Sequence, residues 1–159
     1  MMDIFHNFNI YSLSTSSADA LTPLNAFDLA LLRSDVGNVN LVKISSILPP
    51  SCKYQLNLRL PLGALVPVAY ASITSSKEGQ TIASAVSVAI PKDPKLNGLI
   101  MEYSSVDSNK ETVEDVVTQM ARWGMEKRGY EIDKIISIGS EHTVRDNGCT
   151  FACVILWHS

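Results

Sequence analysis

Two consecutive serines, Ser45 and Ser46, follow an apolar, β-branched stretch and directly precede Ile-Leu-Pro-Pro. Strand interiors favour Val, Ile and Thr, so a serine pair at this point is unusual. A serine hydroxyl can attack a carbonyl held in line with it, provided that donors stabilise the oxyanion. On sequence chemistry alone, two strand-end serines that hydrogen-bond to nearby backbone are the more common case.

A carboxylate stands in a second apolar stretch, Leu-Ile-Met-Glu-Tyr, whose glutamate is Glu102. A carboxyl group buried in such a strand tends to hold its proton near neutral pH, which suits a general acid. A glutamate on the solvent face of an edge strand fits the same letters equally well. The residues alone leave both interpretations open.

The remaining reactive side chains give weaker signals. His142 could suggest a Ser-His-Asp hydrolase, but Ser45 and Ser46 lack the glycines of a Gly-x-Ser-x-Gly elbow. We therefore expect His142 near a β-turn or packed in the sandwich. The cysteines form no Cys-x-x-Cys and are expected to be buried, reduced thiols: Cys52, Cys149 and Cys153. No metal-ligand spacing and no Gly-rich phosphate loop is present, so neither a metal nor a phosphate-bearing cofactor is expected.

Length and composition set the class of protein. The chain has 159 residues, 46% of them hydrophobic and 18% charged, which fits a single domain over residues 1–159. Lys and Arg total 13 against 16 Asp and Glu, so we expect no nucleic-acid partner. No signal peptide or membrane-length apolar stretch appears, and the expectation is a cytoplasmic protein without a membrane partner.

The elements that must position these residues are two helices and about seven strands. One helix should begin at Thr22 as N-cap, with Pro23 at N1, and end at Gly37. A capping box that starts at Ser108 should begin the second, which runs to about Gly129. Strands are expected at about 38–47, 54–58, 66–74, 81–90, 99–104, 132–138 and 149–157, with a possible short strand around 5–11.

The expected fold class is α+β: a layered αββα sandwich of two mostly antiparallel sheets with flanking helices. The amphipathic faces of both helices need a sheet to cover, and strands outnumber helices. Strands 66–74 and 81–90, separated by a short polar loop, are expected to form a hairpin. A single sheet covered on one face is the alternative.

Several segments in combination resemble one family, the pyruvoyl-dependent arginine decarboxylases of the small archaeal type. The resemblance runs from about Pro23 to Trp157. The segments that carry it are Pro-Leu-Asn-Ala-Phe-Asp (23–28), Asn-Leu-Val-Lys-Ile-Ser-Ser (40–46), Gly-Ala-Leu-Val-Pro (63–67), Ala-Ile-Pro-Lys-Asp (89–93), Gly-Leu-Ile-Met-Glu-Tyr (98–103) and Glu-His-Thr-Val (141–144).

The resemblance implies that the chain cuts itself between Ser45 and Ser46, giving a β chain, residues 1–45, and an α chain, residues 46–159. Ser46 would become a covalent pyruvoyl group. The Ser46 hydroxyl attacks the Ser45 carbonyl to form an ester, elimination frees the Ser45 carboxylate, and hydrolysis leaves a ketone. Asn40 is a plausible oxyanion donor, because its even spacing puts it on the same face as Ser46 if the strand is regular.

The resemblance also implies an activity: L-arginine is converted to agmatine and CO₂, for polyamine synthesis. The ketone would condense with the substrate amine and accept the electron pair left by CO₂, as pyridoxal phosphate does elsewhere, so neither that cofactor nor a metal is expected. Glu102 would reprotonate the α-carbon and Asp28 would hold the guanidinium. Leu31 would line the same pocket, although a core leucine is the competing interpretation. Lys43 stands where similar proteins of the family have arginine, and this difference is expected to matter little on an outward-facing strand position.

The implied assembly is a homotrimer, alone or stacked into a hexamer, with active sites that span subunit interfaces. Alternatives stay open: a pyruvoyl decarboxylase for another amino acid, an uncleaved non-catalytic assembly subunit of the same fold, and, more distantly, a serine hydrolase. The first twenty residues lie outside the resemblance, and their role is open.

Overall fold

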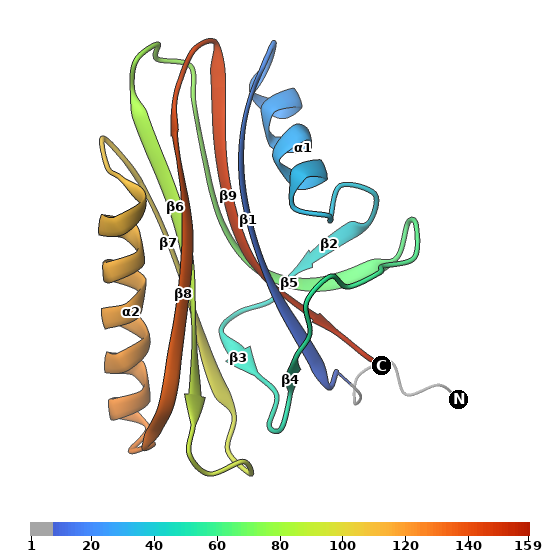
Figure 1. Ribbon diagram of the computed structural model, residues 1–159, viewed down its shortest axis with the longest axis vertical. Helices are drawn as coiled ribbons and strands as arrows, with labels where there is room; N and C mark the ends of the chain where they lie inside the picture. The colour runs from blue at the N-terminus through green and yellow to red at the C-terminus, as the bar shows by residue number, and fades with distance from the viewer. Residues whose placement is uncertain (1–7) are drawn as a thin grey trace.

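Long runs of β-branched and small residues form strands that build two facing sheets, each covered by one helix (Figure 1). The computed structural model describes residues 8–159. The elements, in chain order, are β1 (Ile10–Ala20), α1 (Pro23–Arg33), β2 (Asn40–Lys43), β3 (Ile47–Leu48), β4 (Lys53–Tyr54), β5 (Leu65–Ser75), β6 (Thr81–Pro91), β7 (Gly98–Val106), α2 (Lys110–Lys127), β8 (Ile132–Thr143) and β9 (Asn147–Trp157).

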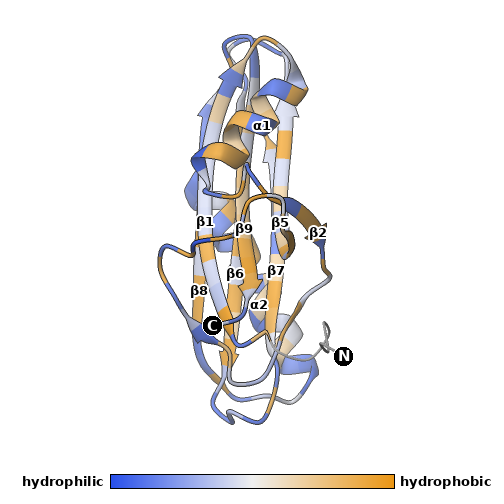
Figure 2. Cartoon of the chain, turned by 90° about the vertical axis from the view of Figure 1, so that its right-hand side faces the viewer, coloured by the Kyte–Doolittle hydropathy of each residue, from blue (hydrophilic) through white to orange (hydrophobic). Residues whose placement is uncertain are grey.

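The first sheet has five strands in the order β2-β5-β9-β1-β4, and the second has four in the order β3-β7-β6-β8. Neighbouring strands are antiparallel, except for the parallel pairs β1–β4 and β2–β5. Helix α1 crosses part of the outer face of the first sheet (Figure 2), and α2 runs along the outer face of the second (Figure 1). The predicted αββα sandwich is confirmed, and the single-sheet alternative is wrong.

Apolar side chains fill all three interfaces between these layers. Phe151 of β9 packs beneath α1, while Val154, on the other face of the same strand, lies between the sheets. Val117 and Met125 of α2 pack against the second sheet. Because β9 is central and buried on both faces, its residues Phe151–Trp157 form a continuous apolar run rather than an alternating one.

The cysteines behave as expected of core residues. Cys149 and Cys153 are buried on the same face of β9, in the cluster beneath α1. Burial raises the pKa of the Cys153 thiol to about 12 and that of Cys52 to about 11. Thiols with such values are unreactive near neutral pH. The prediction of buried thiols is confirmed for Cys149 and Cys153, whereas Cys52 is half-buried.

The helix starts follow local side-chain chemistry. The Asn25 amide donates to Thr22 Oγ1 at 3.1 Å, which confirms Thr22 as the N-cap of α1 with proline at N1. The predicted end at Gly37 is wrong, because α1 stops at Arg33. The predicted capping box at Ser108 is one residue early: Asn109 accepts the Thr112 amide at 2.8 Å and is the N-cap of α2. Neither helix in residues 8–159 has the length and apolarity needed to cross a membrane.

Four strand predictions need correction. The strand expected at 54–58 is wrong, because β4 covers Lys53–Tyr54 and residues 55–58 lie outside any strand. Strands β5 and β6 form no hairpin but lie in different sheets, because a short loop can also carry the chain from one facing sheet to the other. The predicted strand 38–47 is two strands, β2 and β3, which pair in different sheets. Among the described residues of the short strand expected around 5–11, Ile10 and Tyr11 are the ones in a strand, as the start of β1, which pairs with β9 over its full length. Residues 5–7 lie outside the described residues.

Candidate active site

The Ser45–Ser46 peptide lies where the chain crosses from one sheet to the other. The Ile44 amide donates to the Val68 carbonyl of the first sheet at 3.1 Å. Two residues later, the Ser46 carbonyl accepts from the Ile100 amide of the second sheet at 2.7 Å. Ser45 is exposed and Ser46 is half-buried. Hydrogen bonds therefore anchor the chain on both sides of this peptide, while the peptide itself belongs to neither strand.

Glu102 lies on β7, two residues beyond Ile100 and on the same face. That face looks into the interface between the sheets, since Ile100 belongs to the apolar cluster there. Glu102 Oε1 lies 3.2 Å from Lys43 Nζ, and the Glu102 side chain is 36% exposed. Oε2 is buried and has no hydrogen-bond partner among residues 8–159. The carboxylate is thus half in an ion pair and half unsatisfied, which differs from both the enclosed and the solvent-facing positions that the sequence left open.

Lys43 is the residue that sequence reasoning missed. It ends β2, two residues before Ser45, and its Nζ lies 4.5 Å from the centre of the Tyr70 ring as well as against Glu102. The Lys43 side chain is 52% exposed, as expected of an outward-facing position, but its contacts with Tyr70 and Glu102 were not predicted. A strand-end lysine carries no local signal of this contact, because its partners come from β5 and β7.

Asn40 begins β2 and is exposed. Its side-chain Nδ2 donates to the Gly63 carbonyl at 3.1 Å. The regular strand ends at Lys43, so the alternation of faces does not extend from Asn40 to Ser46. The condition on which the oxyanion-donor prediction depended is not met in this conformation.

The two predicted substrate-binding residues lie on α1, away from the sheet–sheet interface. Asp28 is exposed, and its side chain makes no hydrogen bond or ion pair with residues 8–159. Leu31 is half-buried and packs against the cluster beneath α1. Because α1 covers the outer face of the first sheet, the described chain places Asp28 and Glu102 in different layers.

His142 lies on β8 and pairs with Asp19 of β1, with its Nε2 2.8 Å from Asp19 Oδ2. The Arg145 and Asp146 amides also donate to Asp19, at 2.8 and 2.9 Å. Burial alone would raise the pKa of the Asp19 carboxyl, but these three hydrogen bonds outweigh it and hold that pKa well below its ordinary range. No serine hydroxyl of the described chain hydrogen-bonds to His142, so the pair does not extend to a hydrolase triad.

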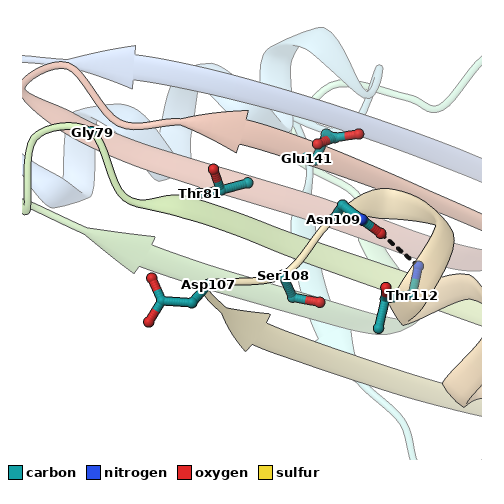
Figure 3. A pocket seen from close by; sticks show the side chains of 7 residues that line it. All are labelled: Gly79, Thr81, Asp107, Ser108, Asn109, Thr112 and Glu141. Atoms are coloured by element: carbon teal, nitrogen blue, oxygen red, sulfur yellow. Dashed lines mark hydrogen bonds between the residues drawn. The ribbon is translucent and has the colours of Figure 1, made fainter.

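A hollow of about 500 Å³ lies near Asp107, which follows the last residue of β7 (Figure 3). The Ser46 carbonyl binds near the opposite end of this strand, at Ile100. The lining of the hollow comes from the β5–β6 loop, the start of α2 and two strands: Gly79, Thr81, Asp107, Ser108, Asn109, Thr112 and Glu141. It contains none of the predicted site residues. Residues 8–159 also contain no group of three His, Cys, Asp or Glu side chains placed to hold a metal ion.

Comparisons with known proteins define the class to which this fold and site belong. The sequence profile of the family described as pyruvoyl-dependent arginine decarboxylase matches residues 10–158. Proteins of that name from Methanococcus aeolicus and Methanocaldococcus jannaschii are 55% and 53% identical over 150 residues, which is 94% of this chain and 90% of each relative. The protein of that name from Thermococcus kodakarensis is 38% identical over 145 residues, 91% of either chain.

The chain belongs to the pyruvoyl-dependent arginine decarboxylase family. Membership implies a covalent pyruvoyl group, and the predicted resemblance is confirmed.

Proposed function

We propose that this chain cuts itself between Ser45 and Ser46 and then decarboxylates L-arginine to agmatine and CO₂. The observation that carries the proposal is the crossover: a Ser-Ser peptide held from both sheets, close to a carboxylate with one unsatisfied buried oxygen. Buried polar atoms are seldom left without a partner in native proteins, and the exceptions concentrate at functional sites. The family membership points to the same reaction.

The proposed self-cleavage uses only the chain and one water. Ser46 Oγ attacks the Ser45 carbonyl carbon, the C–N bond breaks, and the proton from the hydroxyl passes to the nitrogen, which leaves an ester. Loss of the Ser46 α-proton and of the Cβ–O bond frees Ser45 as a carboxylate. Water then displaces ammonia to leave the ketone. Asn40 can stabilise the oxyanion of the first step only if its amide leaves the Gly63 carbonyl.

The residues around Ser46 fit a pyruvoyl group at that position. The group would remain tethered through the Ser46 carbonyl, which the Ile100 amide already holds at 2.7 Å. A pyruvoyl group supplies an electron sink for the pair released with CO₂. Glu102 then delivers a proton to the α-carbon of the substrate, and its unpaired Oε2 is the atom that we expect to carry that proton.

Substrate selection is proposed to rest on Asp28, with Leu31 lining the same pocket. A carboxylate can bind a guanidinium through two parallel hydrogen bonds, and Asp28 is free to do so among the described residues. Since Asp28 and Glu102 lie in different layers of one chain, a second copy is expected to complete the site. We therefore propose a homotrimer, alone or paired as a hexamer. Highly exposed apolar side chains support an assembly: Leu21, Leu62 and Leu65. The free cysteines support a cytoplasmic location.

The experiment is an intact mass measurement under denaturing conditions, coupled to a CO₂-release assay with L-arginine. Cleavage gives fragments of about 5 and about 12 kDa in proportion to chain length, and the larger one lacks a free N-terminal amine. Ser46→Ala removes the nucleophile, so we expect it to stay at 17.4 kDa and to release no CO₂. A wild-type chain that remains whole, or that is cut but inactive toward arginine, contradicts the proposal.

A further inference from the structure

We propose that Lys43 is a positioning residue for the decarboxylation: it holds Glu102 by one carboxylate oxygen so that the other stays free to transfer the proton. This inference rests on the function proposed above. It concerns a residue whose sequence position suggested no role.

Three contacts fix Lys43. Its backbone pairs with Val68 in the β2–β5 ladder, its Nζ lies 4.5 Å from the centre of the Tyr70 ring, and the same Nζ lies 3.2 Å from Glu102 Oε1. The ring is itself held in place, since it packs 5.4 Å from the Phe151 ring and 6.4 Å from that of Phe27. The ammonium group therefore has a defined position, although the lysine side chain as a whole is 52% exposed.

This position orients the Glu102 carboxylate. The glutamate side chain is 36% exposed, yet its Oε2 is buried and unpaired. Oε1 is the oxygen that contacts Lys43, while Oε2 points into the protein. A glutamate side chain has several rotatable bonds, and an unrestrained one would turn an unsatisfied oxygen toward water. The ion pair with Lys43 opposes that rotation and keeps Oε2 inward.

The pair also joins the two proposed products of cleavage. Lys43 lies in residues 1–45 and Glu102 in residues 46–159. After cleavage the ion pair would therefore join the C-terminal end of the β chain to the proposed general acid of the α chain. An ordinary surface ion pair would contribute little to stability or to rate. A positioning role instead predicts a loss in turnover that depends on the charge at residue 43.

The test compares Lys43→Met, Lys43→Arg and Lys127→Met in the self-cleaved enzyme. Lys127 is the matched control, because its Nζ also lies over an aromatic ring, 5.1 Å from the centre of Trp123, but on the outer face of α2. The cleaved fraction is measured by intact mass, and kcat and KM for L-arginine are expressed per cleaved chain. Unfolding curves accompany each variant.

We expect Lys43→Met to cleave normally and to lose roughly 10- to 100-fold in kcat, with KM within about twofold of the wild type. Lys43→Arg keeps the cation and its stacking on Tyr70, and we expect it to recover most of that loss. Lys127→Met should match the wild type. If Lys43→Met fails to fold, Lys43→Gln takes its place, with the same expectation.

The outcomes separate this inference from the function beneath it. A wild-type chain that neither cleaves nor acts on arginine overturns the proposed function. An active wild type with an unchanged kcat in Lys43→Met overturns the role of Lys43 alone. So does a loss of equal size in Lys43→Arg, or a block in cleavage, because the role proposed here begins after the cut and depends on charge.

Discussion

Two carboxylates of this fold, Asp19 and Glu102, each have at least one buried oxygen, but they differ in the hydrogen-bond partners of their oxygens. Asp19 is 4% exposed, and its two oxygens accept from the His142 ring and from the Arg145 and Asp146 amides. Glu102 is 36% exposed, has one oxygen against Lys43 and leaves the other buried without a partner.

The difference agrees with the proposed division of roles, in which Asp19 is structural and Glu102 is catalytic. Both oxygens of Asp19 accept hydrogen bonds within the fold, and these bonds connect β1 to β8 and to the β8–β9 turn. Oε2 of Glu102 keeps an acceptor that the fold does not use, at a cost in stability. Proteins retain such a cost where a proton or a ligand must later bind.

The largest expected effect comes from removing the carboxylate proposed to be catalytic. Glu102→Gln keeps the shape of the side chain but cannot carry the proton, so kcat should fall about 10²- to 10⁴-fold while self-cleavage proceeds. The comparison uses Glu131→Gln, which breaks an exposed ion pair with Lys92 and should leave turnover unchanged. Steady-state formation of agmatine, which requires the protonation step, measures both variants. Equal rates in the two would show that Glu102 is not the acid.

A smaller effect is expected at the exposed carboxylate, Asp28, which the described chain leaves unpaired. Asp28→Asn loses the charged half of a guanidinium contact worth roughly 1.5–3 kcal/mol, so KM for arginine should rise about 10- to 100-fold with little change in kcat. Asp35→Asn, at an exposed aspartate just beyond α1, is the control. An unchanged KM in Asp28→Asn would move arginine recognition elsewhere.

The smallest effect on catalysis, and the clearest on stability, is expected at Asp19. Asp19→Asn weakens hydrogen bonds to a charged acceptor, and the free energy of unfolding should fall by about 1–3 kcal/mol while activity per folded enzyme is kept. Urea unfolding at pH 7 measures this. A variant as stable as the wild type would mean that the satisfied oxygens of Asp19 contribute nothing to the fold.

The difference in the free energy of unfolding between wild type and Asp19→Asn should depend on pH with a definite sign. The folded-state pKa of Asp19 is depressed, so its contribution to stability is full above the ordinary value of about 3.9 and is lost as the pH falls toward the depressed value. The stability gap between wild type and Asp19→Asn should therefore be largest near neutral pH and shrink in acid. A gap that widens below about pH 4 would reverse the assignment.

Local patterns predicted much of this architecture. The αββα layers, the Thr22 cap and the buried cysteines follow from periodicity, capping chemistry and the apolar run of β9. What they could not predict is pairing. Strand β1 is rich in serine and threonine, so it lacks the apolar pattern that predicts a strand. The fold accommodates its hydroxyl groups through hydrogen bonds to other elements: the Ser16 hydroxyl, for example, donates to the Ala30 carbonyl at 2.6 Å.

The site divides in the same way. The Ser45–Ser46 pair and Glu102 could be singled out from their local context and the family resemblance. The contacts of Lys43 could not, because Tyr70 and Glu102 reach it from two different sheets. Asp19 likewise accepts from Arg145, at a separation of 126 residues. No local window spans that separation.

The place of β1 in the first sheet bears on the lifetime of the enzyme. All eleven of its residues pair with β9, and β4 pairs along part of its other edge. After the proposed cut, β1 belongs to one product and both of its neighbours to the other. The products should stay interlocked until the sheet unfolds. The uncut chain folds as a single molecule. Once cut and unfolded, the two products must instead find each other in a bimolecular reaction, which is slow in dilute solution. The cleaved enzyme should therefore owe its lifetime to slow unfolding, that is, to kinetic stability.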